Sequence, residues 1–348
     1  RERKRAGEGV YRSCLDRSCT DLVCVSGLHE CVPGEMHKGT LLRDLLRRRG
    51  FLIDAPIPMW ARIAEEKGFQ GVWGSSLGLS TLMGVRDANE LSWTEVADMM
   101  GRVADSVRIP VLVDGDSGHG HSKIASQFVR RLNQRRIAGV CLEDRTFPKR
   151  NALIKPADGD REALADAAEF CDMLQECRES LQQDDPGNHF QIVARTDALP
   201  AGWGLPECIR RARAYRDAGA DALIIHSTER TSDEVEAFLE EWVKEGEGGR
   251  REPVPIVLIP TTYAENESTD ITRLFDMGAS CIIWANYMLR SDIKAQQSTA
   301  EAIHASQSVR RCEKDGSMAP LSEVFRLQRE QMLQDAQRGD GCARRYSL

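Results

Sequence analysis

From about residue 51 onward, short apolar runs rich in β-branched residues alternate with longer amphipathic stretches. The short runs have the length of buried strands, and the longer stretches repeat with the period of a helix. We predict strands at Phe51–Ala55, Gly71–Gly74, Val111–Asp114, Gly139–Glu143, Gln191–Arg195, Ala222–His226, Ile256–Pro260 and Cys281–Trp284. The expected helices are Met59–Lys67, Trp93–Ser106, Lys123–Arg135, Arg161–Leu181, Leu205–Ala218, Ser232–Val243, Asp270–Met277, Asp292–Ser306 and Leu321–Ala336.

This alternation of strand and helix predicts the class of the fold. Helices that connect successive strands imply a parallel sheet whose faces are covered. About eight such units suffice to close the sheet into an α/β, (β/α)₈ TIM-type barrel. An open doubly wound sheet is the alternative, but no Gly-x-Gly-x-x-Gly turn follows the first strand. Gly68, Gly139, Gly219 and Gly278 precede strands, as suits the left-handed cap that ends a helix.

Both ends of the chain depart from the repeat. We interpret residues 1–40 as an appendage of unknown role and residues 41–348 as the catalytic barrel domain. The appendage holds Cys14, Cys19, Cys24 and Cys31. Their spacing contains no C-x₂-C pair, so a zinc site is only weakly supported. Two helices are expected after the eighth strand, where one would complete the barrel. We expect the extra one, around Val324–Gln331, to pack on a neighbouring subunit.

Charge and cysteine content narrow the class of protein. The 348 residues carry a formal net charge of -7, which argues against non-specific binding to nucleic acid. No apolar run is long enough to span a membrane, and no apolar signal segment follows the charged N-terminus. The cysteines number 11, and nothing in the chain indicates secretion. We therefore expect a reduced, cytoplasmic protein.

Acidic residues gather at the predicted ends of strands, which is where barrels carry their catalytic groups. Asp114 and Asp116 alternate at the end of one strand, Glu143 ends the next, and Asp87 lies in a loop. Such carboxylates repel one another unless a cation lies among them. Carboxylate and water ligands suit Mg²⁺ or Mn²⁺ better than Zn²⁺. The alternative is that each acid only caps the helix that follows it.

Basic residues occupy comparable positions. Arg195 ends an apolar strand, where its charge is costly unless it pairs with an anion or with the acidic residues. A purely structural ion pair is the alternative. His226 ends another strand and is a candidate donor to a phosphoryl oxygen. Lys149 lies in the polar loop of residues 143–151, which is long enough to close over a ligand.

Two further signals are weaker. Ser75, Ser76 and Leu77 follow a strand end, and successive N–H groups in such a turn can hold an anion. His119 and His121 lie in a glycine-rich loop and are minor candidates for a metal ligand.

Several ordered motifs resemble the phosphoenolpyruvate mutase family of the isocitrate lyase superfamily. They are Trp73-Gly74-Ser75, Gly84-Val85-Arg86-Asp87-x-Asn89-Glu90, Asp114-x-Asp116-x-Gly118-x-Gly120, Leu142-Glu143-Asp144-x-x-Phe147-Pro148-Lys149-x-Asn151, Ala201-Gly202-Trp203-Gly204-Leu205, His226-Ser227 and Trp284-Ala285-Asn286. The resemblance runs from about Leu52 to Arg329. It implies a Mg²⁺-dependent enzyme that interconverts phosphoenolpyruvate and phosphonopyruvate. That isomerase reaction forms the carbon–phosphorus bond in phosphonate biosynthesis.

The resemblance also implies roles for individual residues. The residues expected to be catalytic are Asp87, Lys149, Asn151, Arg195 and His226. The expected substrate contacts are Trp73, Ser75, Ser76, Leu77, Asn151, Arg195, His226 and Ser227. Asp114 matches a direct metal ligand, and Asp87, Asp116 and Glu143 match residues that act through metal-bound water. The family is typically tetrameric with its last helix exchanged between subunits, and Phe325–Arg329 matches that helix, so a homo-oligomer, dimer or tetramer, is expected.

The chain departs from the family pattern at a few positions. Ala55-Pro56-Ile57-Pro58 stands where the family usually has Ala-His-Asn-Gly. Ser76 replaces a usual glycine, which narrows the anion-binding turn or changes its backbone angles. Ala152 replaces a serine, and His121 replaces an asparagine.

Three other functions compete with this interpretation. The same site would hydrolyse phosphonopyruvate to pyruvate and phosphate if the polar loop of residues 143–151 admitted water, but Arg86-Asp87-x-Asn89-Glu90 favours the mutase. A carbon–carbon lyase is disfavoured, because the loop lacks the cysteine of the Lys-x-Cys-Gly-His motif of that branch. A non-catalytic barrel that binds through its cysteine-rich tail is disfavoured by the intact carboxylates and Arg195.

Overall fold

The structure is a computed structural model that describes residues 36–154, 160–246, 254–263, 270–314, 316 and 318–329. The chain divides into two units, residues 1–35 and residues 36–348, and every described residue belongs to the second. The barrel unit thus begins slightly before residue 41. The four N-terminal cysteines and the end of the last expected helix lie outside the described residues.

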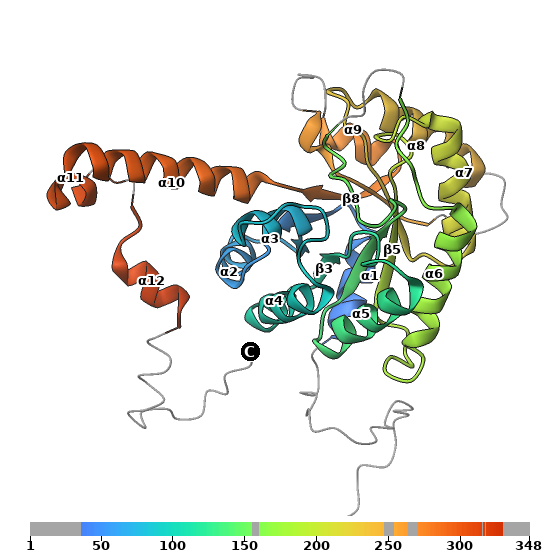
Figure 1. Ribbon diagram of the computed structural model, residues 1–348, viewed down its shortest axis with the longest axis horizontal. Coiled ribbons are helices and arrows are strands. Elements are labelled where there is room, and N and C mark those ends of the chain that lie inside the picture. Colours follow the sequence, from blue (N-terminus) through green and yellow to red (C-terminus); the bar gives the residue numbers. More distant parts are fainter. Residues whose placement is uncertain are drawn as a thin grey trace, which may run out of the picture. The chain divides into compact units, whose positions relative to one another are not determined.

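Eight parallel strands close into a barrel in which sequence neighbours are also spatial neighbours (Figure 1). The strands are β1 (Gly50–Asp54), β2 (Gly71–Gly74), β3 (Val111–Asp114), β4 (Gly139–Glu143), β5 (Gln191–Thr196), β6 (Ala222–Ile225), β7 (Ile256–Leu258) and β8 (Ala279–Trp284). β1 pairs with both β2 and β8, which closes the barrel. The predicted (β/α)₈ fold is confirmed, and each predicted strand agrees with an observed one to within two residues.

Helices cover the outside of this barrel. They are α2 (Pro58–Glu66), α3 (Ser76–Leu82), α4 (Trp93–Ser106), α5 (Ser122–Gln134), α6 (Ala167–Ser180), α7 (Gly204–Asp217), α8 (Asp233–Gly246) and α9 (Ile271–Asp276). A helix before the barrel, α1 (Lys38–Leu45), and three after it, α10 (Tyr287–Ser306), α11 (Val309–Lys314) and α12 (Leu321–Leu327), complete the described elements. The short 3₁₀ helix η1 (Pro260–Thr262) follows β7.

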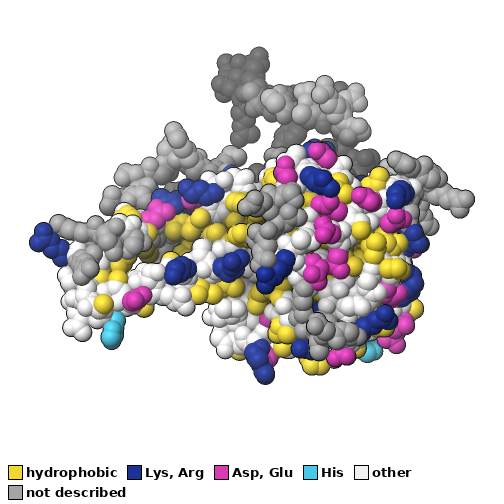
Figure 2. Space-filling view, turned by 90° about the horizontal axis from the view of Figure 1, so that it is seen from above, with side chains coloured by type: hydrophobic (Ala, Val, Ile, Leu, Met, Phe, Trp, Pro, Cys, Tyr) yellow, Lys and Arg dark blue, Asp and Glu magenta, His cyan; other side chains and the backbone are white. Residues whose placement is uncertain are grey.

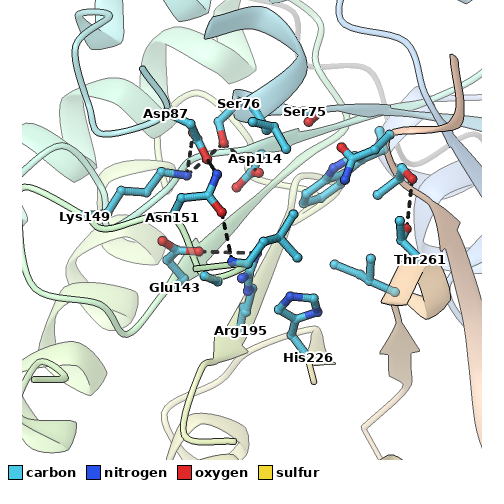
Figure 3. Close-up of a pocket in the computed structure, with 17 residues that line it drawn as sticks. Ser75, Ser76, Asp87, Asp114, Glu143, Lys149, Asn151, Arg195, His226 and Thr261 are labelled. Atoms are coloured by element: carbon cyan, nitrogen blue, oxygen red, sulfur yellow. Dashed lines mark hydrogen bonds and ion pairs between the residues drawn. The ribbon is translucent and has the colours of Figure 1, made fainter. Parts of the chain in front are cut away.

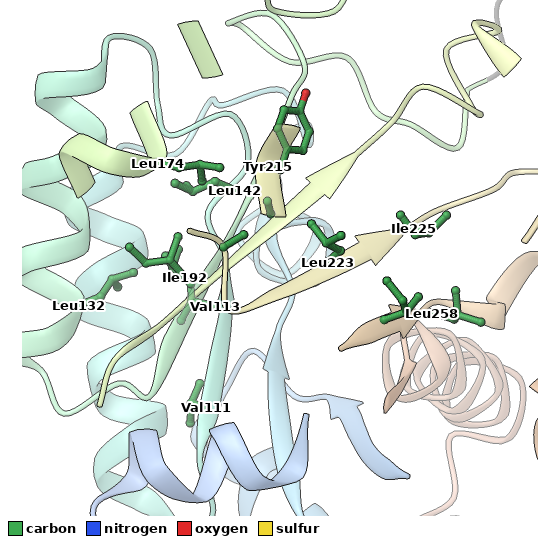
Figure 4. Close-up of a cluster of buried hydrophobic side chains, with 14 of the residues drawn as sticks. Val111, Val113, Leu132, Leu142, Leu174, Ile192, Tyr215, Leu223, Ile225 and Leu258 are labelled. Atoms are coloured by element: carbon green, nitrogen blue, oxygen red, sulfur yellow. The ribbon is translucent and has the colours of Figure 1, made fainter. Parts of the chain in front are cut away.

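Alternate residues of each strand face opposite sides of the barrel wall, so the core has two layers. On β3, Val111 and Val113 point outward to the helices, whereas Leu112 points inward. Figure 4 shows part of the outer layer, where strand side chains meet Leu132 of α5 and Leu174 of α6. The inner layer fills the barrel, and α1 contributes to it through residues that include Leu42. The inner face therefore also decides which side chains reach the barrel mouth.

Some helix boundaries differ from the prediction. α6 begins at Ala167 rather than Arg161, because the Asp166 side chain accepts hydrogen bonds from the N–H groups of Ala168 and Glu169 and caps the helix there. α10 begins at Tyr287 rather than Asp292, and α12 ends at Leu327. α1, α3 and α11 were not predicted.

Three of the four glycines expected in helix caps take that role. Gly68, Gly219 and Gly278 have positive φ angles of 88°, 97° and 112°. Before β4 the left-handed residue is instead Arg136, with a φ of 61°. Gly139 begins the strand there, and a Cβ atom on it would lie only 2.6 Å from the backbone carbonyl oxygen of Gln191 and 2.9 Å from Leu42 Cδ2. Glycine is therefore required for close packing of β4 on β5.

The helix after β8, α10, is much less buried against the barrel than the helices that follow the other strands. Among the 20 residues of α10, all of them described, Leu289 is the buried one. Figure 1 shows α10 extending away from the barrel, with α11 at its far end. α12 contacts α2 through Arg326, whose guanidinium lies 2.7 Å from a Glu66 carboxylate oxygen. No helix in the described part of the chain combines the length and apolar character needed to cross a membrane.

Candidate active site

The alternation along four strands places four polar side chains at the inner mouth of the barrel. On each of these strands the polar residue lies two positions after an apolar residue of the inner layer. The apolar residues are Leu112, Cys141, Val193 and Ile224. The polar residues are Asp114, Glu143, Arg195 and His226, each of which is less than 9% exposed. Glu143 and Arg195 are also register partners across β4 and β5. Figure 3 shows these side chains around one cavity.

These four side chains line one cavity together with other residues of the barrel mouth. The expected site residues that line it are Trp73, Ser75, Ser76, Leu77, Asp87, Asp114, Glu143, Lys149, Asn151, Arg195 and His226. Asp116 and Ser227 do not line it. Asp116 instead pairs with the ammonium of Lys149. The Ser227 hydroxyl donates a hydrogen bond to Glu234.

Lys149 lies in the middle of the acidic residues. Its Nζ is 2.8 Å from Asp87 Oδ1 and 2.6 Å from Asp116 Oδ1, and it donates a 3.0 Å hydrogen bond to Ser76 Oγ. Burial by itself would lower the pKa of Lys149, but Asp116, Glu143, Asp114 and Asp87 together raise it well above its ordinary value. The lysine is therefore an ammonium ion that compensates the carboxylates around it.

Asparagine side chains hold the loop that carries Lys149 over the cavity. Asn151 Nδ2 donates to Asp87 Oδ2 at 2.9 Å. The backbone N–H of Lys149 donates to Asn89 Oδ1 at 2.7 Å, and Asn89 Nδ2 donates to Asp116 Oδ2 at 2.9 Å. The loop is thus in a closed position in which Lys149 is 6% exposed.

Arg195 is held by a buried acid that the sequence analysis did not single out. Its Nε donates to Asp197 Oδ1 at 2.7 Å, and its Nη1 lies 3.4 Å from Glu143 Oε2. Burial raises the pKa of Asp197, but Arg195 and Arg145 outweigh it and hold that pKa well below its usual range. The signal was present in Arg195-Thr196-Asp197, because residues two apart at a strand end share a face.

His226 is neutral in this environment. Burial, with Arg195 beside it, lowers the pKa of His226 to about 3. A neutral imidazole carries one N–H donor and one acceptor nitrogen. The buried Nδ1 of His226 has no hydrogen-bond partner among the described residues. A ligand in the cavity can therefore receive a directed hydrogen bond here without a second positive charge next to Arg195.

The acidic residues fit a hydrated divalent cation better than a fully protein-ligated one. No group of three His, Cys, Asp or Glu side chains within the described ranges is arranged as a ready set of metal ligands. Glu143 Oε1 is buried without a hydrogen-bond partner, and burial raises the pKa of Glu143 to about 8. A nearby cation would favour its charged form. Mg²⁺ commonly uses one or two carboxylates and keeps several waters.

The two loop histidines make structural contacts outside the cavity lining. His119 packs edge-on against Phe128 of α5, with ring centroids 5.0 Å apart, and burial lowers the pKa of His119 to about 4. His121 caps α5 by accepting a hydrogen bond from the Lys123 N–H. Neither residue lines the cavity.

The far wall of the cavity is formed where β7 and β8 end; sequence reasoning missed Thr261 there, whereas Asn286 belongs to the motif Trp284-Ala285-Asn286. Thr261 and Asn286 line it, and Thr261 Oγ1 donates to the Ala285 carbonyl oxygen at 2.8 Å. Asp54 Oδ2 accepts a 3.1 Å hydrogen bond from the Asn286 N–H, which ties β1 to the start of α10. Burial raises the pKa of Asp54 to about 7.

Known proteins resemble this chain in sequence and in fold. The family described as phosphoenolpyruvate phosphomutase matches residues 42–304. The phosphoenolpyruvate phosphomutase of Tetrahymena pyriformis is 41% identical over 301 residues, which cover 86% of this chain and 94% of the relative. The crystal structure of a phosphoenolpyruvate phosphomutase from Streptomyces platensis subsp. rosaceus is 36% identical, with a TM-score of 0.78, and the match covers 87% of this chain and 99% of that one. A phosphonopyruvate hydrolase solved with oxalate and Mg²⁺ is 31% identical, with a TM-score of 0.74 and coverage of 86% and 99%.

Proposed function

The chain belongs to the phosphoenolpyruvate phosphomutase family, and we propose that it interconverts phosphoenolpyruvate and phosphonopyruvate. In the forward direction the bond between phosphorus and the enol oxygen breaks and a bond between phosphorus and C3 forms, so no second reactant is needed. The observation that carries the proposal is the closed cavity in which Asp87, Lys149 and Asn151 meet the inner-mouth residues of the barrel. We further propose that this step serves phosphonate biosynthesis.

Each wall of the cavity has a role in this proposal. Ser75, Ser76 and Leu77 bind the substrate carboxylate at the start of α3, beside Trp73. Arg195 offers a planar set of donors to the phosphoryl oxygens, held in place by Asp197. Neutral His226 and the Asn151 amide complete the contacts with the moving group. Phosphoryl transfer depends mainly on such positioning and charge compensation.

Asp114, assisted by Asp116, Glu143 and Asp87, would hold Mg²⁺ in this site. Bound there, the ion would neutralise charge on the substrate oxygens. The relative solved with oxalate and Mg²⁺ supports this part of the proposal. Lys149 compensates the charge of Asp87 and Asp116, the two carboxylates that its ammonium contacts directly.

Exclusion of water distinguishes the mutase from a hydrolase acting on the same substrate. A metaphosphate-like species exposed to water would be trapped as phosphate. The loop of residues 145–154, which we call the gating loop, closes the cavity through Lys149 and Asn151. This closed position favours transfer of the phosphoryl group between the two substrate atoms.

A phosphorus NMR time course tests the proposed activity. The full chain, Mg²⁺ and phosphonopyruvate are mixed, and a phosphate-ester signal is expected to grow as the phosphonate signal falls. Free phosphate together with pyruvate would instead identify a hydrolase. If neither product forms with Mg²⁺ present, both activities are contradicted.

We also propose that the C-terminal helices pack on a second copy of the chain, as a dimer or tetramer. Large apolar side chains are exposed along α10, α11 and α12: Tyr287, Ile293, Ile303, Val309, Leu321, Val324 and Phe325. Figure 2 shows apolar side chains gathered along this extension. Exposed apolar area of this kind is typical of a subunit interface.

Charging the apolar side of α10 is expected to dissociate the oligomer. We predict that Ile293→Asp together with Ile303→Asp lowers the mass measured by sedimentation equilibrium to that of a smaller species, because a charge buried in an interface is strongly unfavourable. Ser298→Asp, at an exposed position on the opposite side of the same helix, is the matched control and should keep the wild-type mass. A wild-type chain that sediments as a monomer of 38.9 kDa would contradict the proposal.

A reducing, cytoplasmic setting is part of the proposal. Its support is the state of the described cysteines Cys141, Cys171, Cys177, Cys208, Cys281 and Cys312, all of which are free thiols. Cys141 and Cys281 are buried within strands, where they pack as small apolar groups.

A further inference from the structure

Ser76 connects the gating loop to the proposed metal carboxylate. Its Oγ donates a 2.9 Å hydrogen bond to Asp114 Oδ2 and accepts a 3.0 Å hydrogen bond from Lys149 Nζ. Ser76 is 7% exposed and opens α3 at the cavity wall. We propose that Ser76 is a positioning residue that latches the gating loop shut and couples its closure to the orientation of Asp114. This inference rests on the proposed function for its catalytic consequence, but not for its effect on the loop.

The direction of the two hydrogen bonds follows from the chemistry of the groups. An ammonium ion has donors and no acceptor, and an ionised carboxylate has acceptors and no donor. The single hydroxyl hydrogen must therefore point at Asp114, while an oxygen lone pair faces Lys149. When the loop opens and Lys149 leaves, the hydroxyl loses the partner that fixes its rotation. Closure of the loop and orientation of Asp114 are linked through one rotatable group.

Because Lys149 is buried, its hydrogen bond to Ser76 contributes to the stability of the closed gating loop. The Lys149 side chain is 5% exposed, so in the closed loop its ammonium depends on protein partners rather than on water. Two of those partners are the carboxylates of Asp87 and Asp116, and the third is the Ser76 hydroxyl. A smaller residue at position 76 would leave part of a buried charge without a hydrogen bond, which disfavours the closed loop relative to the solvated open one.

Ser76→Ala tests the latch with little other change. Alanine keeps the helix and removes only the hydroxyl. In the metal-free protein held in chelator, amide hydrogen exchange in the gating loop is expected to become about tenfold faster, the effect of losing one hydrogen bond to a charged group. With Mg²⁺ and phosphonopyruvate, the ratio of free phosphate to phosphoenolpyruvate should rise by a similar factor, because the loop admits water more often.

Two variants separate the latch from general damage to α3. Ser80→Ala makes the same chemical change at a buried position one turn along the helix, away from the cavity lining, and should alter neither exchange in the loop nor the product ratio. Ser76→Thr keeps the hydroxyl and should restore slow exchange.

The two readouts have separate meanings. Loop exchange in Ser76→Ala equal to that of the wild-type chain would overturn the latch, whatever the enzyme's activity. Faster exchange with an unchanged product ratio would overturn the coupling to water exclusion. Failure of the wild-type chain to convert phosphonopyruvate would remove the proposed function and leave the exchange result to decide the latch.

Discussion

Replacing Asp87 by alanine is expected to reduce turnover by about a thousandfold or more, the scale seen when a preorganised electrostatic group is removed from an active site. Asp87 lines the cavity and binds both loop residues that close it, at 2.8 Å to Lys149 Nζ and through a 2.9 Å hydrogen bond from Asn151 Nδ2. The change therefore removes a charge next to the moving phosphoryl group and one anchor of the gating loop. Steady-state rates by phosphorus NMR or a coupled assay measure the loss.

The fold should survive this change, because Asp87 belongs to a loop rather than to the core. The thermal midpoint and the circular dichroism spectrum of Asp87→Ala are expected to match those of the wild-type chain closely. Asp87→Asn keeps the shape of the side chain and should recover little of the rate if the charge is what matters. Glu90→Ala, in the same loop but paired with exposed Arg86, is the control and should lose less than about tenfold. A near-normal rate in Asp87→Ala would remove Asp87 from the site.

The inner-mouth residues could be predicted because the strand period extends to the last residue of each strand. Asp114 and Arg195 each lie two residues after an inward apolar side chain, so the pattern alone determines that they face the cavity. The same extrapolation placed Asp116 beside Asp114, facing inward. The prediction for Asp116 fails in part, since Asp116 does not line the cavity. The reason is that β3 ends at Asp114 and Asp116 has a left-handed φ of 51°. Beyond a strand end the turn, not the period, sets the direction of a side chain.

Contacts between distant segments could not be predicted from local pattern. Lys149 was expected on a gating loop, but its pairing with Asp116 and its hydrogen bond to Ser76 depend on how that loop closes. The buried group formed by Asp144, Arg211 and Tyr215 is similar, since residues 67 to 71 apart meet there. Such pairs carry no periodicity that a single sequence reveals.

Short helices were missed for a different reason. α1, α3 and α11 have 8, 7 and 6 residues, too few for a helical repeat to stand out from chance. Isolated helices of fewer than about 12 residues are also marginal on their own propensity, so their stability comes from tertiary packing. α1 illustrates this, because Leu42 and Leu45 belong to the inner layer of the barrel.

Chelation is expected to abolish turnover while leaving the barrel folded. We predict that excess EDTA lowers the rate by about a thousandfold or more and that added Mg²⁺ restores it, because Asp114 and Glu143 would otherwise face a negatively charged substrate with no cation between them. EDTA already saturated with Mg²⁺ is the control and should leave the rate unchanged.

The same experiment has a second readout that depends on Lys149. Removing one partner of a buried ion pair typically costs about 3–5 kcal/mol, so an acidic cluster held together by metal alone should destabilise the protein when the metal leaves. Here the ammonium of Lys149 lies 2.8 Å from Asp87 and 2.6 Å from Asp116 and supplies that compensation itself. The thermal midpoint should therefore fall by only a few degrees in EDTA. In Lys149→Met, which has no cation to offer, chelation should lower the midpoint much further. Full activity in excess chelator would exclude the metal from the mechanism, and equal midpoint shifts in both proteins would exclude compensation by Lys149.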